Sequence, residues 1–174
     1  MRNRIRVAAT ICAVLFATGC GGSSTTNATA ALKPLPATGC SLLSPAEVKS
    51  LLGTVSTCRP LRSNTPNQDL VAAGWQTARG GQSVKAGVSR KNIADDKETF
   101  EDEAGTKSSG GARAVSGLGD DAFLVFDPHS ATSGSIWILH GNDVIIVAVT
   151  HGKLTGSALA RTLTAAGRRL VASY

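Results

Sequence analysis

Residues 135–151, SIWILHGNDVIIVAVTH, constrain the fold more than any other stretch of this chain. Gly141 and Asn142 form a two-residue turn sequence of the kind that joins antiparallel strands. A turn there places Ile138 opposite Ile145 and makes both faces of the hairpin apolar. Both faces must therefore be covered, and we expect these two strands to be central in their sheet. The same register pairs His140 with Asp143, Ile136 with Val147, Leu139 with Val144 and Trp137 with Ile146.

An amphipathic helix predicted from about residue 156 to residue 172 can cover one face of this hairpin. Three covers are open for the second face: the N-terminal helix with its neighbouring loops, a second copy of the chain, or a ligand in a groove. The apolar stripe of the C-terminal helix consists of Leu159, Leu163, Ala166 and Leu170.

The stretch SLLSPAEVKSLLG predicts a capped helix over residues 44–52. Ser44 is a good N-cap, Pro45 suits the first helical position, and Glu47 completes a capping box three residues after the cap. Gly53 can end the helix in a left-handed conformation. The apolar side of this helix, which we expect to face inward, consists of Val48, Leu51 and Leu52.

The remaining segments predict further strands and a short acidic helix. Residues 72–89 contain two alternating runs around a glycine turn, and another strand begins near Ala122. The segment IADDKETFEDEAG, residues 93–105, predicts the helix; its carboxylates lack the spacing of a calcium loop and indicate a solvated face rather than a cation site. The expected fold class is α+β, with a mainly antiparallel sheet of about five strands, a capped N-terminal helix, a short acidic middle helix and a C-terminal amphipathic helix.

The N-terminus has the organisation of an export signal. Three arginines in the first six residues precede the apolar run of residues 7–16, which is too short to span a bilayer as a helix. The small residues Ala17-Thr18-Gly19 then lead to Cys20, and this order resembles the bacterial lipobox, although Ala17 stands where leucine is most usual. We therefore expect 1–19 to be a lipoprotein signal peptide and Cys20 to be lipidated. The alternative is a plain secretory signal with an accidental cysteine.

Residues 20–39 predict a flexible tether between the lipidated cysteine and a single domain over 40–174, because small, polar and proline residues predominate there. Removal of the leader also removes Arg2, Arg4 and Arg6, which leaves 15 basic against 12 acidic residues and lowers the net charge from +6 to +3. The exported part has no block of basic residues with interleaved aromatics. We therefore expect no nucleic-acid partner.

Cysteine arithmetic predicts one disulfide. The chain has four cysteines, of which Cys12 leaves with the leader and Cys20 carries lipid. Cys40 and Cys58 remain, and an even pair in a small exported domain indicates a disulfide bond. The rival interpretation, a metal site, lacks a CxxC motif and a nearby histidine, so no metal is expected.

The chemistry-bearing residues of the exported part predict no catalytic centre and no cofactor. His129 and His151, with Asp127, could meet at one strand end, but they lack a fourth metal ligand. The adjacent pair Asp120-Asp121 suits a turn better than glycosidase carboxylates, because neighbouring strand residues point to opposite faces. The sequence has no G-x-S-x-G motif and no phosphate loop.

Two tryptophans, Trp75 and Trp137, are candidate pocket residues. Tryptophan supplies a large apolar surface with one polar atom, which suits the wall of a binding pocket. The competing interpretation places each in the core, because the chain has few aromatic residues.

The order of these features resembles the small secreted lipoproteins of mycobacteria and related actinobacteria that carry a domain of unknown function. The resemblance rests on the lipobox, the Ser/Thr/Pro tether, the CSLLSPAEV opening, the tryptophan-bearing strand, the GLGDDAF turn and the apolar hairpin before a terminal helix. Many members place a cysteine close before the strand tryptophan, where this chain has Gly74. The resemblance implies a cell-envelope location and no established catalytic residues.

These observations predict a non-enzymatic lipoprotein on the extracytoplasmic face of the cell membrane, attached through its N-terminal lipid. Its domain is expected to bind a hydrophobic envelope molecule or a partner protein. Two alternatives are a hydrolase that acts on envelope polymers and a structural or sensory accessory of a membrane complex.

Overall fold

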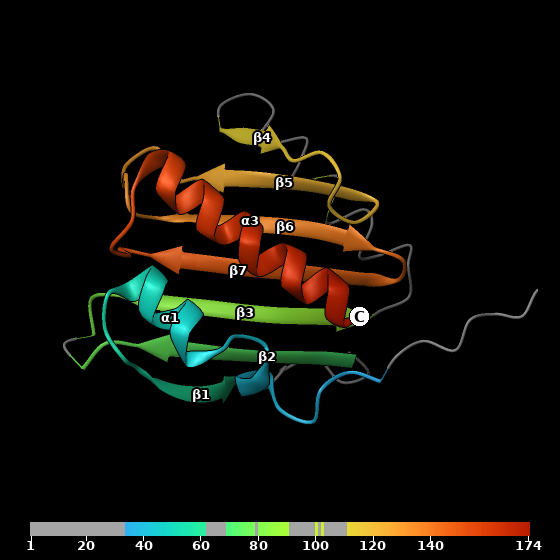
Figure 1. The fold of residues 1–174 in the computed structure, drawn as a ribbon, viewed down its shortest axis with the longest axis horizontal. Helices are drawn as coiled ribbons and strands as arrows, with labels where there is room; N and C mark the ends of the chain where they lie inside the picture. The colour runs from blue at the N-terminus through green and yellow to red at the C-terminus, as the bar shows by residue number, and fades with distance from the viewer. Residues whose placement is uncertain (1–33, 62–68, 79, 91–99, 101, 103–110) are drawn as a thin grey trace, which may run out of the picture. The chain divides into compact units, whose positions relative to one another are not determined.

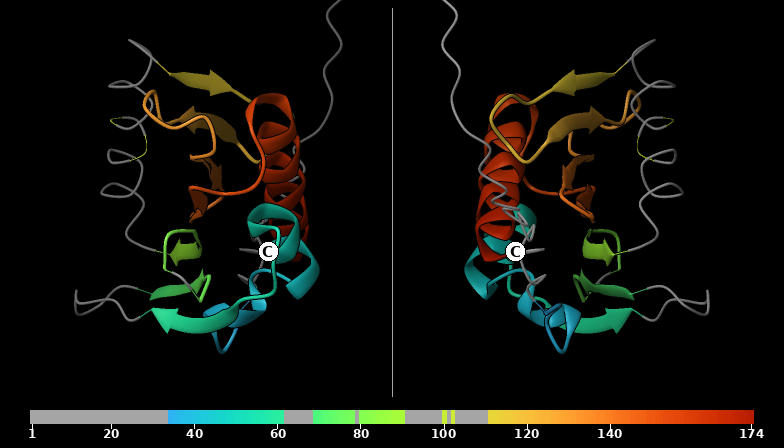
Figure 2. Two further views of the ribbon diagram at one scale, coloured as in Figure 1. Left: turned by 90° about the vertical axis from the view of Figure 1, so that its left-hand side faces the viewer. Right: turned by 90° about the vertical axis from the view of Figure 1, so that its right-hand side faces the viewer.

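Residues 34–61, 69–78, 80–90, 100, 102 and 111–174 are described in the computed structural model, and they form one seven-stranded sheet with two α-helices (Figure 1). All neighbouring strands are antiparallel, in the order β1-β2-β3-β7-β6-β5-β4. Both helices lie on the same face of the sheet (Figure 2). The bounds are η1 Gly39–Ser41, α1 Pro45–Leu52, β1 Thr57–Leu61, β2 Asp69–Gln76, β3 Ser83–Arg90, β4 Ala112–Ala114, β5 Asp121–Phe126, β6 Gly134–His140, β7 Asp143–Thr150 and α3 Gly156–Ser173.

The predicted fold class, α+β with about five strands and an acidic middle helix, is wrong in its elements. The sheet has seven strands, and β1 and β4 at its two edges are the strands that the sequence pattern did not reveal. Both are short and mostly exposed, so they lack the apolar alternation that predicts a strand. The described residues include no acidic middle helix, and the segment predicted to form it lies outside them except for Phe100 and Asp102.

The predicted central hairpin is confirmed in its register. Strands β6 and β7 pair Ile138 with Ile145 and Trp137 with Ile146, and β3 lies on the other side of β7. Gly141 has φ 57° in the turn, a left-handed conformation that glycine adopts without a side-chain clash. The hairpin is therefore internal to the sheet, with neighbouring strands on both sides.

The predicted N-terminal helix is confirmed together with its caps. Ser44 Oγ accepts a hydrogen bond from Glu47 N at 3.3 Å, and Glu47 Oε2 accepts one from Ser44 N at 2.7 Å. Gly53 ends α1 with φ 81°. Glu47 Oε1 also accepts a hydrogen bond from Arg169 Nε at 2.6 Å, so the capping residue joins α1 to α3.

The predicted disulfide is confirmed, and it fastens η1 to β1. Cys40 and Cys58 are bonded, with their Cα atoms 5.8 Å apart. Next to Cys40, Gly39 lies so close to β2 that an added Cβ would meet Ala72 O at 2.1 Å. The two cysteines are 18 residues apart in sequence. In the chain-entropy description, a disulfide that closes a loop of this length stabilises the folded state by roughly 3 kcal/mol.

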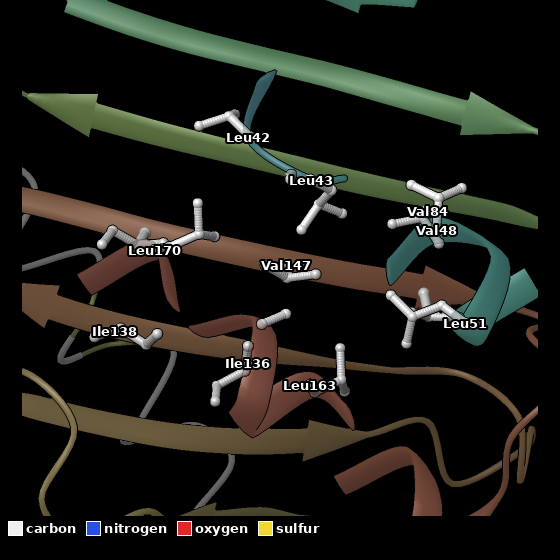
Figure 3. Close-up of a cluster of buried hydrophobic side chains, with 14 of the residues drawn as sticks. Leu42, Leu43, Val48, Leu51, Val84, Ile136, Ile138, Val147, Leu163 and Leu170 are labelled. Carbon is white, nitrogen blue, oxygen red and sulfur yellow. The ribbon is translucent and has the colours of Figure 1, made fainter. Parts of the chain in front are cut away.

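The main core lies between the sheet and the helices (Figure 3). The predicted stripe of α3 is confirmed, because all four of its residues are buried. Gly167 lets α3 approach closely, since a Cβ at this position would lie 2.6 Å from Ile138 Cδ1. The sheet and the helices contribute, among others, Leu42, Leu43, Val48, Leu51, Val84, Ile136, Ile138, Val147, Leu163 and Leu170.

Candidate functional site

The structure places Trp75 and Trp137 on opposite faces of the sheet and does not bring them together. Trp75 on β2 pairs with Val84 and is buried in the core under the helices. Trp137 on β6 pairs with Ile146 and Phe123 on the other face, where it is half-buried. The two residues therefore cannot line one pocket, and Trp137 is the one that remains partly accessible.

Trp137 belongs to an apolar cluster on the face opposite α1 and α3, here called the Trp137 cluster. Its indole ring is stacked on Phe123, with ring centres 6.1 Å apart and an interplanar angle of 4°. Phe100 meets the ring of Phe123 edge-on at 4.9 Å. Trp137 Nε1 donates a hydrogen bond to Ser135 Oγ at 3.0 Å, so its polar atom has a local partner. The cluster consists of Phe100, Phe123 and Val144, which are buried, and Ala112, Val125, Trp137, Leu139 and Ile146, which are partly buried.

The second face of the central hairpin is the face that carries the Trp137 cluster. Among the described members, Phe100 is the one that does not come from a strand of the sheet. Beyond Ile146 the same face continues onto β3 and β2 through Gly87 and Ala72, which carry little or no side chain. Among the described residues, the buried apolar side chains on this face therefore belong to the β5-β6-β7 half of the sheet, whereas Leu61 of β1, which pairs with Ala72, is 42% exposed.

A second group of polar residues lies where β7 ends. His151 has φ 50°, and its main-chain N–H donates to Ser133 Oγ at 2.9 Å. His151 Nδ1 lies 3.4 Å from Ser130 Oγ, which is itself 2.8 Å from Ser133 Oγ. A contact between a serine hydroxyl and a histidine ring is found in catalytic triads, where the histidine acts as the base for the serine nucleophile. A triad also needs a third group that orients the histidine.

The orienting group is absent from this polar cluster within the described residues. The Asp127 carboxylate accepts a hydrogen bond from the main-chain N–H of His129 at 2.8 Å, and none of the described carboxylates bonds His151. His140 lies at the opposite end of β7, beside the turn. The described residues contain no group of three or more His, Cys, Asp or Glu side chains that could hold a metal ion. Hydrogen bonding here organises the loop before β6.

The Asp120-Asp121 pair has a structural role at its first member. Asp120 Oδ2 accepts a hydrogen bond from Gly141 N at 2.6 Å, and its own N–H donates to Leu139 O at 2.8 Å. Gly119 has φ 65°, and a Cβ there would meet Leu139 O at 2.3 Å. The predicted turn holds only for Asp120, which lies at a bend and fastens the loop before β5 to the β6–β7 turn, whereas Asp121 is the first residue of β5.

Two charged features were not identified from the sequence. Arg90 binds Asp143 through two hydrogen bonds of 2.7 Å, and Asp143 is only 4% exposed. Burial and the charge of Asp143 raise the pKa of the nearby Tyr174 hydroxyl. The second feature is a groove whose lining includes Arg113, Arg161 and Arg168. In the sequence, the groove could have been suspected only from Arg161 and Arg168, whose spacing of seven residues places them on one face of the predicted C-terminal helix.

Comparison of the chain with known protein families, with curated proteins and with solved structures gives no match. Membership of the actinobacterial lipoprotein group therefore stays a prediction. The predicted leader 1–19, Cys20 and most of the predicted tether lie outside the described residues. In the part of the chain that is described, no helix is both long enough and apolar enough to cross a membrane.

Proposed function

We propose that this chain is a non-enzymatic lipoprotein of the cell envelope, attached to the extracytoplasmic face of the membrane through Cys20. Its folded part binds a hydrophobic envelope molecule at the Trp137 cluster. The observation that carries this proposal is the gathering of three aromatic rings on the sheet face opposite both α-helices, with Trp137 only half-buried. Aromatic side chains provide large apolar contact areas at binding sites.

The composition of the Trp137 cluster supports an apolar ligand. All of its described members are apolar side chains, and the indole N–H already has Ser135 as a partner. A ligand that covers the ring therefore needs no polar group to satisfy Trp137. Burial of apolar surface contributes about 25 cal/mol per Å² of favourable free energy. A ligand that covers the partly exposed ring of Trp137 would therefore gain binding free energy.

The disulfide supports the proposed location. Cys40 and Cys58 form a bond that persists in oxidising compartments outside the cytoplasm and is rare inside it. This agrees with the leader, whose charged start and short apolar run are typical of an export signal.

The site can be tested because the chain has only two tryptophans. In a Trp75→Phe variant, Trp137 is the only tryptophan, and in a Trp137→Phe variant Trp75 is. We expect a brominated maltoside detergent, which is uncharged and quenches indole fluorescence on contact, to quench the Trp75→Phe protein strongly. The Trp137→Phe protein is the matched control and should be quenched little, since Trp75 is 4% exposed.

Equal quenching of the two variants, or none in either, would contradict an apolar site at Trp137. Native mass spectrometry of the exported protein then identifies the natural occupant. A discrete added mass that is lost on denaturation indicates a bound small molecule. A dimer mass, or a stable protein partner, would instead assign this face to protein contacts and overturn the small-molecule proposal.

A further inference from the structure

A groove with a volume of about 490 Å³ lies between α3 and the edge strand β4. It is on the helix-bearing face of the sheet, because residues of α3 line it, whereas the Trp137 cluster is on the opposite face. Three arginines line it, accompanied by the hydroxyl-bearing residues Ser116 and Thr164. The groove is therefore a surface with its own chemistry, and it is independent of the proposed apolar site.

Helix periodicity places two of the arginines along one wall of the groove. Arg161 and Arg168 are seven residues apart in α3, which is close to two turns, so their side chains share one helix face. Thr164 and Ala165 lie between them on the same face and also line the groove. This wall is exposed at both arginines.

Sheet register places the third arginine on the opposite wall. Arg113 in β4 is paired with Leu124 in β5, and paired residues of antiparallel strands point to the same face. Leu124 is buried in the core beneath the helices. Arg113 therefore projects on the side that carries α3, and the three arginines line the groove from two separate elements.

The described residues that line this groove do not balance its charge. None of these ten residues is acidic. None of Arg113, Arg161 and Arg168 makes an ion pair or side-chain hydrogen bond with another described residue. By contrast, Arg90 is bound by Asp143 and Arg169 by Glu47. Three like charges that line one groove, with no acid among its described residues, favour an anion as a partner.

We propose that this arginine groove binds the phosphate ester group of an anionic ligand. Guanidinium groups present paired N–H donors that match phosphate oxygens, and charge-assisted bonds of this kind are the strong ones. Ser116 and Thr164 add hydroxyl donors beside the arginines. A lipid head group and a soluble phosphorylated glycan share this chemistry.

The test is isothermal titration of the full exported protein, held in an uncharged maltoside detergent, with glycerol phosphate. We expect saturable binding that weakens as salt is raised, because screening reduces the attraction between charges. Each single change, Arg113→Gln, Arg161→Gln or Arg168→Gln, should weaken affinity about tenfold, and the triple variant should show no binding. Arg59→Gln is the matched control, because Arg59 is an exposed arginine on β1 that does not line this groove.

A competition arm distinguishes the two sources of phosphate. If micelles doped with phosphatidylglycerol displace glycerol phosphate while phosphatidylcholine does not, the groove takes a lipid head group. If neither lipid competes, it takes a soluble phosphate ester. The proposal is overturned if wild-type protein binds no glycerol phosphate, or if the triple variant binds as wild type does. Since all three arginines are exposed, an unchanged unfolding midpoint shows that the triple variant is folded.

Discussion

The carboxylate of Glu47 both caps α1 and holds Arg169 of α3. Burial raises the pKa of Glu47, but the hydrogen bonds from Arg169 and Ser44 and the charge of Arg169 outweigh it, and the net pKa is lowered. A lowered pKa in the folded state means that the ionised carboxylate stabilises the fold. This contribution is present above the ordinary glutamate pKa and is lost as pH falls through the lowered value.

Glu47→Gln should therefore lower the free energy of unfolding by roughly 1 kcal/mol at pH 7. Glutamine can still cap the helix, but it has no charge and cannot form the ion pair with Arg169. At pH 3 the difference between variant and wild type should shrink, since glutamate itself becomes neutral there. Urea unfolding at the two pH values measures both quantities. Asp121→Asn, an exposed acid without a described side-chain bond, is the control. A difference that does not change with pH would contradict the role of the ionised carboxylate.

The sequence predicted a structural feature correctly where that feature depends only on residues close together in the chain. The cap of α1 needs only residues 44–53, and the turn at Gly141 needs only its two neighbouring strands. The positions of Trp75 and Trp137 on opposite faces depended on the pairing of distant strands. The same holds for the meeting of Arg113 with α3, because β4 and α3 are far apart in sequence.

At the level of elements, the packing of α3 on β6 depends on the absence of a side chain at Gly167. A Cβ there would lie 2.6 Å from Ile138 Cδ1, and Ile138 is fully buried. Alanine in a helix interior is ordinarily about 1 kcal/mol more favourable than glycine. Overpacking of a filled core costs about 1 to 3 kcal/mol, so the steric effect should win.

Gly167→Ala should thus lower the free energy of unfolding by about 1 kcal/mol, measured by urea denaturation. Ile138→Val removes the methyl group that the new Cβ would meet. In that background the Gly167→Ala change should be neutral or stabilising, because only its helix propensity remains. Stabilisation by Gly167→Ala in the wild-type background would show that α3 shifts without cost and would contradict the close approach.

Elements at the centre of the sheet could be predicted from the sequence, and elements at its edges could not. β6 and β7 have neighbouring strands on both sides and carry an apolar run, whereas β1 is mostly exposed, contains Pro60 and lacks such a run. Proline lacks an N–H donor and is tolerated in an edge strand, where one side of the strand has no partner to bond. The short β4 pairs only with β5, so its formation depends on a neighbour rather than on its own pattern.

For the molecule as a whole, the two faces of the sheet carry different chemistry. The helix-bearing face holds the main core and the arginine groove, and the opposite face holds the Trp137 cluster. An apolar ligand and a phosphate ester would therefore occupy separate surfaces. Phosphate binding should survive Trp137→Phe, while quenching by an uncharged detergent should survive the loss of the groove arginines.

The proposed lipid anchor concerns the whole chain, because it would determine the compartment in which both proposed surfaces bind their ligands. Acyl chains contribute about 0.8 kcal/mol per buried methylene, and salt does not weaken this burial, whereas it screens electrostatic attachment. We expect wild-type protein to stay with membranes at high salt and its mature mass to fit a chain that begins at Cys20 with a diacylglycerol thioether. Cys20→Ser should abolish the added mass. An unmodified wild-type N-terminus would contradict the lipid anchor. If the Cys20→Ser protein stays with membranes, its mass shows whether the uncleaved leader is still present. A membrane-bound Cys20→Ser protein that has lost its leader would show that another part of the chain anchors it.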